Sequence, residues 1–246
     1  MLSMIPRLIG HRGAKESAPE NTLASIREAA AQGAPWIEFD VMLTRDGAAV
    51  VIHDDTLDRT TNGRGPMNAI DREDLRRLDA GSWFDSRFAG ERVPDFTEAL
   101  DLAQSLGLGI NVEIKPFPGQ EVATAETIVS ILQRHWPDNA RLLVSSFEVP
   151  SLDTVRRLAP ALPLGYLLWD PPADWAGIAD RLRADTLNVD QERQTADTVA
   201  AYRATGRPVL AYTVNDAERA ADLFAWGVSA VFTDAPGRLG RELGVL

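Results

Sequence analysis

Two carboxylates stand one residue apart in the stretch that covers residues 36–43. This stretch is rich in branched and aromatic residues, a composition that predicts a β-strand. Side chains alternate between the two faces of a strand, so Glu38 and Asp40 share one face while their apolar neighbours share the other. Two carboxylates on one face are costly to bury unless a cation lies between them. The pair therefore predicts a metal site.

An imidazole follows the two carboxylates closely in the sequence. Asp46-Gly47 is a strong signal for a tight turn, and residues 49–52 then predict a second strand that runs back along the first. This hairpin delivers His53 to the region where the two carboxylates emerge. A group that transfers protons is thus expected beside the predicted metal.

Composition narrows the class of protein. The chain has 246 residues, of which 45% are hydrophobic, and its formal net charge of −11 argues against nucleic acid or an anionic membrane surface as a partner. The absence of cysteine excludes disulfides, thiolate nucleophiles and cysteine-ligated zinc. A first strand expected at residues 5–10 leaves no room for a signal peptide, and no apolar run approaches membrane-spanning length. We therefore expect a soluble, cytoplasmic protein without membrane insertion.

The order of the expected elements indicates an α/β fold. Eight strands are expected, each followed by a helix, and this is the pattern of a (β/α)8 TIM barrel. A doubly wound open sheet is the alternative, but it usually carries a glycine-rich phosphate-binding turn, which this sequence lacks. Residues 1–246 are expected to form a single domain, with a polar, turn-rich insertion at about residues 56–93 after the second strand. The expected strands cover residues 5–10, 36–43, 109–115, 141–146, 163–168, 186–190, 208–214 and 229–233.

The active groups of a TIM barrel lie at the C-terminal ends of its strands. His11 and Arg12 end the first expected strand, and Glu113 and Lys115 end the third, where alternation places both on one face. Together with His53 and the two acids of the second strand, they are expected to meet at one mouth of the barrel. Oxygen ligands without sulfur favour a hard cation, Mg²⁺ or Ca²⁺. A transition-metal site of two histidines and one carboxylate would use some of the same residues.

Each of these acidic residues also has a purely structural explanation. Glu38 could be a paired core acid, Asp40 a helix cap, and Glu113 with Lys115 an ordinary ion pair on a strand. We prefer the functional explanation because all of them fall at strand ends.

Other polar and aromatic residues near the strand ends have less specific roles. Asn21, Thr22 and Asp234 are expected to cap helices rather than to bind ligands. Phe147 and Tyr212 are candidates for a wall of the substrate site.

A series of short motifs, in one order along essentially the whole chain, resembles the glycerophosphodiester phosphodiesterase family. The short cytosolic bacterial form is the most similar. This resemblance implies a TIM barrel with a small insertion after the second strand. The motifs are His11-Arg12-Gly13, Pro19-Glu-Asn-Thr22, Glu38-Phe-Asp40, Thr44-Arg-Asp-Gly47, His53-Asp54, Arg59-Thr-Thr-Asn-Gly63, Glu113-Ile-Lys115, Ser145-Ser-Phe147 and Tyr212-Thr-Val-Asn215.

The resemblance also implies the identity of the site residues and the reaction. The reaction is hydrolysis of a small-molecule glycerophosphodiester to sn-glycerol 3-phosphate and an alcohol, with one histidine deprotonating the nucleophile and the other protonating the departing alkoxide. The implied roles are one divalent metal on Glu38, Asp40 and Glu113, an acid–base pair made of His11 and His53, and phosphate contacts from Arg12 and Lys115.

Several alternatives remain open at this stage. Either histidine could be the acid, and the nucleophile could be water or the neighbouring glycerol hydroxyl. The preferred alcohol, the choice between Mg²⁺ and Ca²⁺, and the oligomeric state are also open. A lysophospholipase D-like enzyme would need an apolar groove or a membrane-seeking insertion. A non-catalytic phosphate-binding barrel is another alternative, but it would have no need of two histidines placed opposite each other.

Overall fold

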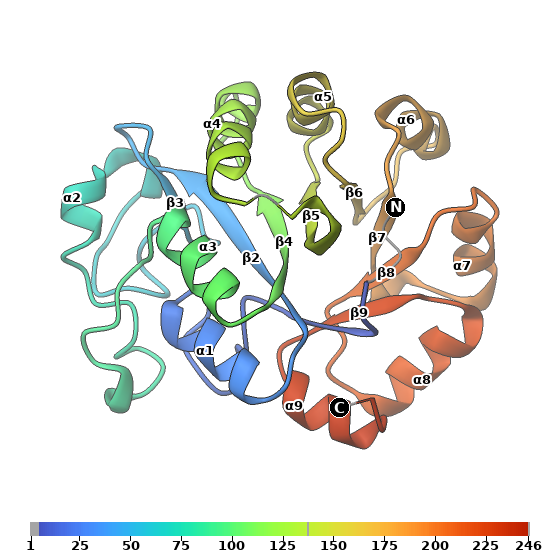
Figure 1. The fold of residues 1–246 in the computed structure, drawn as a ribbon, viewed down its shortest axis with the longest axis horizontal. Helices are drawn as coiled ribbons and strands as arrows, with labels where there is room; N and C mark the ends of the chain where they lie inside the picture. Colours follow the sequence, from blue (N-terminus) through green and yellow to red (C-terminus); the bar gives the residue numbers. More distant parts are fainter. Residues whose placement is uncertain (1–4, 137, 246) are drawn as a thin grey trace.

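The computed structural model describes residues 5–136 and 138–245. Within these residues, eight parallel strands close into a barrel, because β9 pairs with β1 and β1 also pairs with β2 (Figure 1). The predicted (β/α)8 fold is therefore confirmed, and the open doubly wound sheet is excluded. The barrel strands are β1 (Leu8–Gly10), β2 (Trp36–Leu43), β4 (Gly109–Ile114), β5 (Leu142–Ser146), β6 (Leu164–Leu168), β7 (Thr186–Asp190), β8 (Val209–Tyr212) and β9 (Ala230–Thr233).

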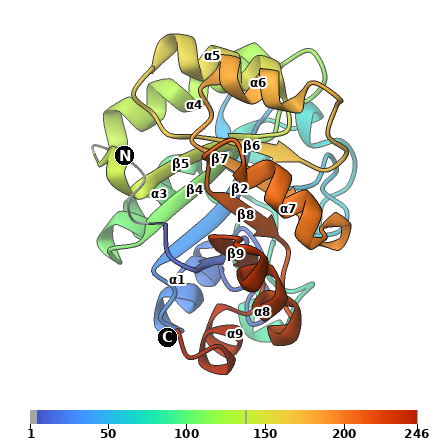
Figure 2. The same ribbon diagram turned by 90° about the vertical axis from the view of Figure 1, so that its right-hand side faces the viewer.

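Helices surround the strands on the outside of the barrel (Figures 1 and 2). None of the helices in the described ranges is long and apolar enough to cross a membrane. The helices that follow barrel strands are α1 (Leu23–Ala31), α3 (Phe96–Ser105), α4 (Glu121–His135), α5 (Val149–Leu158), α6 (Trp175–Leu182), α7 (Ala196–Arg203), α8 (Ala217–Trp226) and α9 (Pro236–Glu242).

Side-chain alternation along the strands divides the core into two layers. Outward-pointing residues such as Ile37 and Phe39 pack against the helices. Inward-pointing residues such as Trp36 fill the barrel interior, and the indole lies so close to Gly109 that a Cβ atom there would come within 2.2 Å of it. Toward the C-terminal end of β2 the inward face becomes polar at Glu38. The apolar filling thus stops where the predicted site begins.

A hairpin and a long irregular segment follow β2. Strand β3 (Ala49–Val51) pairs antiparallel with β2, as the Asp46-Gly47 turn predicted. Residues 52–95, here called the β3–α3 segment, then run along one side of the barrel, at the left of Figure 1, and contain the short helix α2 (Arg72–Leu75). Its apolar side chains, Leu57 among them, pack in a small cluster that also includes Met42 of β2 and Val50 of β3. That residues 1–246 are a single domain with an insertion at about 56–93 stays a prediction.

Two local predictions in the first part of the chain differ from the structure. The first strand covers only Leu8–Gly10, and not residues 5–10, because Pro6 has no backbone N–H to contribute to the ladder. Helix α1 is capped by Thr22, as predicted, since its side chain accepts a hydrogen bond from the backbone N–H of Ser25. Asn21, which was also expected as a cap, has a left-handed backbone (φ 58°) and its side chain points elsewhere.

Candidate active site

Three carboxylates gather at the C-terminal end of the barrel. Glu38 and Asp40 come from β2 and Glu113 from β4, and Asp40 is paired in register with Glu113. One oxygen from each lies within 4.8 Å of the others. This proximity favours a shared role for the three carboxylates over separate roles as core acids or caps.

The electrostatics of this cluster favour the binding of a cation. Burial, together with repulsion from Asp40 and Glu113, raises the pKa of Glu38 well above its usual range. Burial and the charge of Asp40 raise the pKa of Glu113 to about 8. The buried Oε1 of Glu38 has no hydrogen-bond partner. An unpartnered carboxylate oxygen facing two more carboxylates fits a hard divalent cation, which accepts oxygen ligands.

Asp40 differs from its two neighbours because cations already surround it. Burial alone would raise its pKa, but the charges of Arg12 and Lys115, and of His53 whenever its imidazole is protonated, lower it below the usual range. The side-chain amide of Asn21 also donates a hydrogen bond to Oδ2 of Asp40, at 2.8 Å. The left-handed backbone of Asn21 thus serves the site and not the helix.

Each of the two histidines is held by an aspartate. Nδ1 of His11 donates to Asp234 at 2.6 Å, and Nδ1 of His53 donates to Asp54 at 2.7 Å. Burial lowers the pKa of both imidazoles, so both are neutral near pH 7. With the proton on Nδ1, the lone pair lies on Nε2. The Nε2 atom of His53 accepts a hydrogen bond from the ammonium of Lys115 at 3.0 Å.

The expectation that Asp234 caps a helix is wrong. Helix α9 has Ala235 at its N-cap position, without a side-chain cap. The carboxylate of Asp234 instead binds His11 through Oδ1 and accepts a hydrogen bond from the Asn215 amide at Oδ2, at 2.8 Å. The sequence signal for this contact was the Tyr212-Thr-Val-Asn215 motif. Asn215 holds Asp234, and Asp234 in turn holds His11.

Arg12 is bound to carboxylates on three sides. Its backbone N–H donates to Glu38 Oε2 at 2.9 Å, which the left-handed backbone of Arg12 (φ 51°) makes possible. Its side chain donates to Glu20 at 2.6 Å and lies 3.2 Å from Asp40 Oδ2 through Nε. The guanidinium is therefore fixed at the edge of the cluster. Glu20, almost fully buried, was not anticipated from the sequence.

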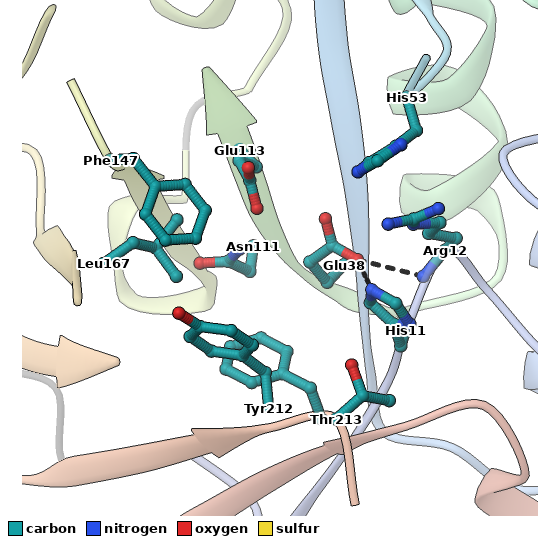
Figure 3. A pocket seen from close by; sticks show the side chains of 11 residues that line it. His11, Arg12, Glu38, His53, Asn111, Glu113, Phe147, Leu167, Tyr212 and Thr213 are labelled. Atoms are coloured by element: carbon teal, nitrogen blue, oxygen red, sulfur yellow. Dashed lines mark hydrogen bonds and ion pairs between the residues drawn. The ribbon is translucent and has the colours of Figure 1, made fainter. Parts of the chain in front are cut away.

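A cavity of about 150 Å³ opens at this site and has two unlike halves. Figure 3 shows His11, Arg12 and His53 on one side, Phe147 and Tyr212 on the other, and the carboxylates between them. The rings of Phe147 and Tyr212 pack edge to face, with their centroids 5.9 Å apart. Both residues, the candidates for a wall of the substrate site, line the cavity.

Asn111 is a further lining residue that the sequence reasoning missed. It lies two residues before Glu113 on β4, so alternation places both side chains inside the barrel. Its amide nitrogen donates to Ser145 Oγ at 2.9 Å, while the buried Oδ1 has no partner and is available to accept a hydrogen bond from a ligand.

Comparison with known proteins identifies the family. The sequence profile of the glycerophosphoryl diester phosphodiesterase family matches residues 11–238. The chain belongs to this family. A glycerophosphodiester phosphodiesterase of Caldanaerobacter subterraneus subsp. tengcongensis is 35% identical over 236 residues, which are 94% of this chain and 95% of that protein. The family resemblance inferred from the motifs is therefore confirmed, and so is the enzyme class of phosphoric diester hydrolase.

Solved structures of phosphodiesterases have the same fold as this chain. A phosphodiesterase of Oleispira antarctica, solved in complex with the product sn-glycerol 3-phosphate, is 38% identical with a TM-score of 0.94, covering 98% of this chain and 97% of that one. A glycerophosphodiester phosphodiesterase of Agrobacterium tumefaciens is 29% identical with a TM-score of 0.78, covering 96% and 100%.

All the site residues expected from the sequence meet at this one place. Five of them line the cavity, and the other two contact those five: Asp40 lies against Arg12, and Lys115 against His53. Their chemical roles stay predictions. The residues that line the cavity are His11, Arg12, Glu38, His53 and Glu113.

Proposed function

We propose that this family member hydrolyses glycerophosphodiesters to sn-glycerol 3-phosphate and an alcohol, with one divalent cation, Mg²⁺ or Ca²⁺, and two histidines as acid and base. The observation that carries the proposal is the pairing of each histidine with an aspartate. Because both Nδ1 atoms are engaged, both Nε2 atoms are left for chemistry beside the carboxylate cluster. The product bound in the Oleispira antarctica relative supports the same substrate class.

Glu38, Asp40 and Glu113 would hold the cation, one carboxylate oxygen from each. When bound, a divalent cation supplies Lewis-acid charge that polarises phosphoryl oxygens and neutralises charge developing on them. Two observations support this fit. Oε1 of Glu38 has no hydrogen-bond partner, and the pKa values of Glu38 and Glu113 are raised. A bound cation would give that oxygen a partner and stabilise the charged form of both carboxylates.

His11 and His53 would transfer the protons. A neutral imidazole with its lone pair on Nε2 accepts the proton of the attacking hydroxyl, and its aspartate stabilises the imidazolium that results. The other imidazole must carry a proton on Nε2, which the negative charge of a bound diester favours. That proton goes to the alkoxide as the phosphorus–oxygen bond breaks. Water fits this scheme in one step. The glycerol hydroxyl fits it in two, because its attack forms a cyclic phosphate that water must then open. Either histidine fits each role.

Arg12 and Lys115 would bind the remaining phosphate oxygens. Arg12 is held rigidly by Glu20 and Asp40, so it offers a fixed positive edge to an anion. Lys115 is on a flexible stem, and its ammonium can leave His53 for a phosphate oxygen. Moving the lysine also frees the Nε2 lone pair of His53, so binding of the anion would expose this imidazole for proton transfer.

The substrate is a small molecule rather than a polymer or a membrane. A cavity of about 150 Å³ suits a compact glycerophosphoryl group, and the net charge of −11 disfavours nucleic acid. The apolar wall of Phe147 and Tyr212 would lie along the carbon atoms of that group. A cytoplasmic location and a role in glycerol and lipid metabolism follow as parts of the same proposal.

Product analysis tests the proposal. Purified protein is incubated with glycerophosphocholine and Mg²⁺ or Ca²⁺, and products are identified by mass spectrometry. We expect sn-glycerol 3-phosphate and choline. Phosphocholine and glycerol would show that the other phosphate ester bond breaks, and no turnover of any glycerophosphodiester would reject the proposed reaction.

A further inference from the structure

One arginine of the β3–α3 segment binds two carboxylates of the site at once. Arg59 donates to both oxygens of Asp54, through Nε at 2.6 Å and Nη2 at 2.8 Å. It also donates to both oxygens of Glu20, through Nη1 at 2.8 Å and Nη2 at 2.8 Å. The planar guanidinium thus fills its donor positions with two carboxylates that come from different loops.

Each of these carboxylates holds a residue of the proposed machinery. Asp54 accepts the Nδ1 proton of His53 at 2.7 Å. Glu20 accepts a hydrogen bond from Arg12 at 2.6 Å. A continuous path therefore runs from His53 through Arg59 to Arg12, although no described bond joins His53 and Arg12 directly.

Burial makes this arrangement stiff on the side of Glu20. The Glu20 side chain is only 2% exposed, and burial alone would raise its pKa. Hydrogen bonds from Arg59 and the charge of Arg12 instead lower that pKa to about 2. A buried carboxylate needs both partners, because removing one leaves charge without compensation.

The segment also fixes Arg59 itself. The turn that carries it is anchored by Leu57, which is buried in the apolar cluster of the segment. The backbone N–H of Leu57 donates to Gly65 at 2.9 Å, and Thr61 donates through Oγ1 to the Leu57 carbonyl at 2.6 Å. The side chain of Arg59 is 43% exposed, so its position comes from this turn and from the two carboxylates rather than from core packing.

We propose that Arg59 is a positioning residue that couples the turn at residues 57–65 to the active site, aligning His53 through Asp54 and Arg12 through Glu20. This inference rests on the proposed function for its kinetic consequences. Arg59 is not among the residues that line the cavity, and its described hydrogen bonds go to Asp54 and Glu20 rather than to the carboxylate cluster. Its effect on the rate passes through the imidazole, and its effect on anion binding passes through Arg12.

The test separates these two effects by using a second background. Arg59→Gln should lower kcat by about tenfold or more, the scale on which misplaced groups cost rate. In His53→Ala protein the same change should lower the remaining kcat by less than about threefold, because the imidazole it positions is already gone. An equal loss of kcat in both backgrounds would mean that Arg59 acts through general stability and would overturn the proposal.

A conservative variant separates geometry from charge. Arg59→Lys keeps the charge but cannot hold two carboxylates with a planar fork, so it should lose most of the kcat that Arg59→Gln loses. Wild-type kcat in Arg59→Lys would overturn the positioning role. Arg64→Gln is the matched control, since Arg64 lies in the same turn and is 86% exposed beside Asp58. Wild-type kcat is expected there.

Folding and function are tested separately. If Arg59→Gln alone does not fold, the double variant Glu20→Gln/Arg59→Gln removes the unpaired buried charge. This double variant is then used instead of Arg59→Gln in both backgrounds.

Affinity for sn-glycerol 3-phosphate, measured by calorimetry at saturating Mg²⁺, gives a readout without turnover. Arg59→Gln should weaken it severalfold, with and without His53. Unchanged affinity would overturn the link to Arg12. A wild-type protein that binds this product without hydrolysing diesters would reject the proposed function and leave this measurement of Arg59 valid.

Discussion

The ammonium nitrogen of Lys115 lies 3.0 Å from Nε2 of His53. A lysine ammonium can only donate, so the imidazole must accept at Nε2 and carry its proton on Nδ1, where Asp54 receives it. Lys115 therefore occupies the lone pair of His53 in this structure. In the proposed mechanism a bound anion would draw the ammonium away and expose that lone pair.

Replacing Lys115 by arginine tests this arrangement. The sequence contains only two lysines, Lys15 and Lys115, among its 25 basic residues. A planar guanidinium is wider than an ammonium and should displace either the phosphate or His53. Lys115→Arg should keep the melting temperature but lose about tenfold or more in kcat/KM, on the order of 1.4 kcal/mol.

Lys15→Arg is the control for that experiment. Lys15 is 31% exposed, and its ammonium lies 4.0 Å from Asp234 Oδ1, outside the cavity lining. It should lose much less in kcat/KM. Equal and small losses at both positions would show that charge alone matters at residue 115.

The histidine pair is expected to act as a unit. His11→Ala and His53→Ala should each lower kcat by about 10²-fold or more, the usual scale for loss of a positioned acid or base. Both should fold, since each residue faces a cavity rather than the apolar core. The double variant should lose little more than either single variant. A near-wild-type kcat for one single variant would assign that histidine a structural role.

Replacing Asp234 by asparagine should lower activity although the side chain keeps nearly the same size and shape. The amide can donate to Nδ1 of His11, which moves the imidazole proton to Nε2 and takes away the lone pair that faces the cavity. We expect a loss of about 10²-fold or more in kcat, measured beside Asp216→Asn, a helix cap of α8 that should change only the melting temperature. A kcat loss no larger than that of Asp216→Asn would show that Asp234 does not set the tautomer.

The carboxylate cluster predicts a pH dependence of stability in metal-free protein. The pKa of Glu113 is about 8 in the folded chain, against an ordinary value of 4.5 when unfolded. Between pH 4.5 and about pH 8 the folded chain keeps this proton while the unfolded chain has lost it. Stability from the raised pKa therefore falls as pH rises toward 8 and levels off above it. The window from about pH 7 to pH 8 isolates this fall, since the histidines, whose pKa values burial lowers, are neutral there.

Thermal unfolding in chelator measures this effect. The melting temperature of wild-type protein should fall across that window, and the fall should shrink in Glu113→Gln, which has no proton to lose. A melting temperature that stays constant or rises in chelated wild-type protein would contradict the raised pKa.

Residue alternation explains why much of the site could be predicted. Glu38 and Asp40 share a face by parity alone, and the hairpin turn then brings His53 beside them. His11 and Asp234, in contrast, lie 223 residues apart and meet only because β9 closes the barrel against β1. The barrel was expected, but a side chain just after a strand can cap a helix or turn inward, and the sequence does not distinguish the two.

The contacts made by loops could not be predicted for a related reason. Asn21 was expected as a helix cap because asparagine often is one, yet its left-handed backbone turns the side chain onto Asp40. Arg59 and Glu20 lie in irregular segments, where no periodicity tells which way a side chain points. Their partners follow from the path of the backbone, which is set by packing elsewhere.

Activity with and without metal tests the central claim most directly. Protein treated with chelator and then freed of it is assayed on glycerophosphocholine before and after addition of Mg²⁺ or Ca²⁺, with Glu113→Gln in parallel. The cluster of Glu38, Asp40 and Glu113 predicts that chelation abolishes activity, that one of these cations restores it, and that Glu113→Gln needs a higher concentration of that cation. Full activity in metal-free wild-type protein, or an unchanged metal requirement in Glu113→Gln, would contradict the account.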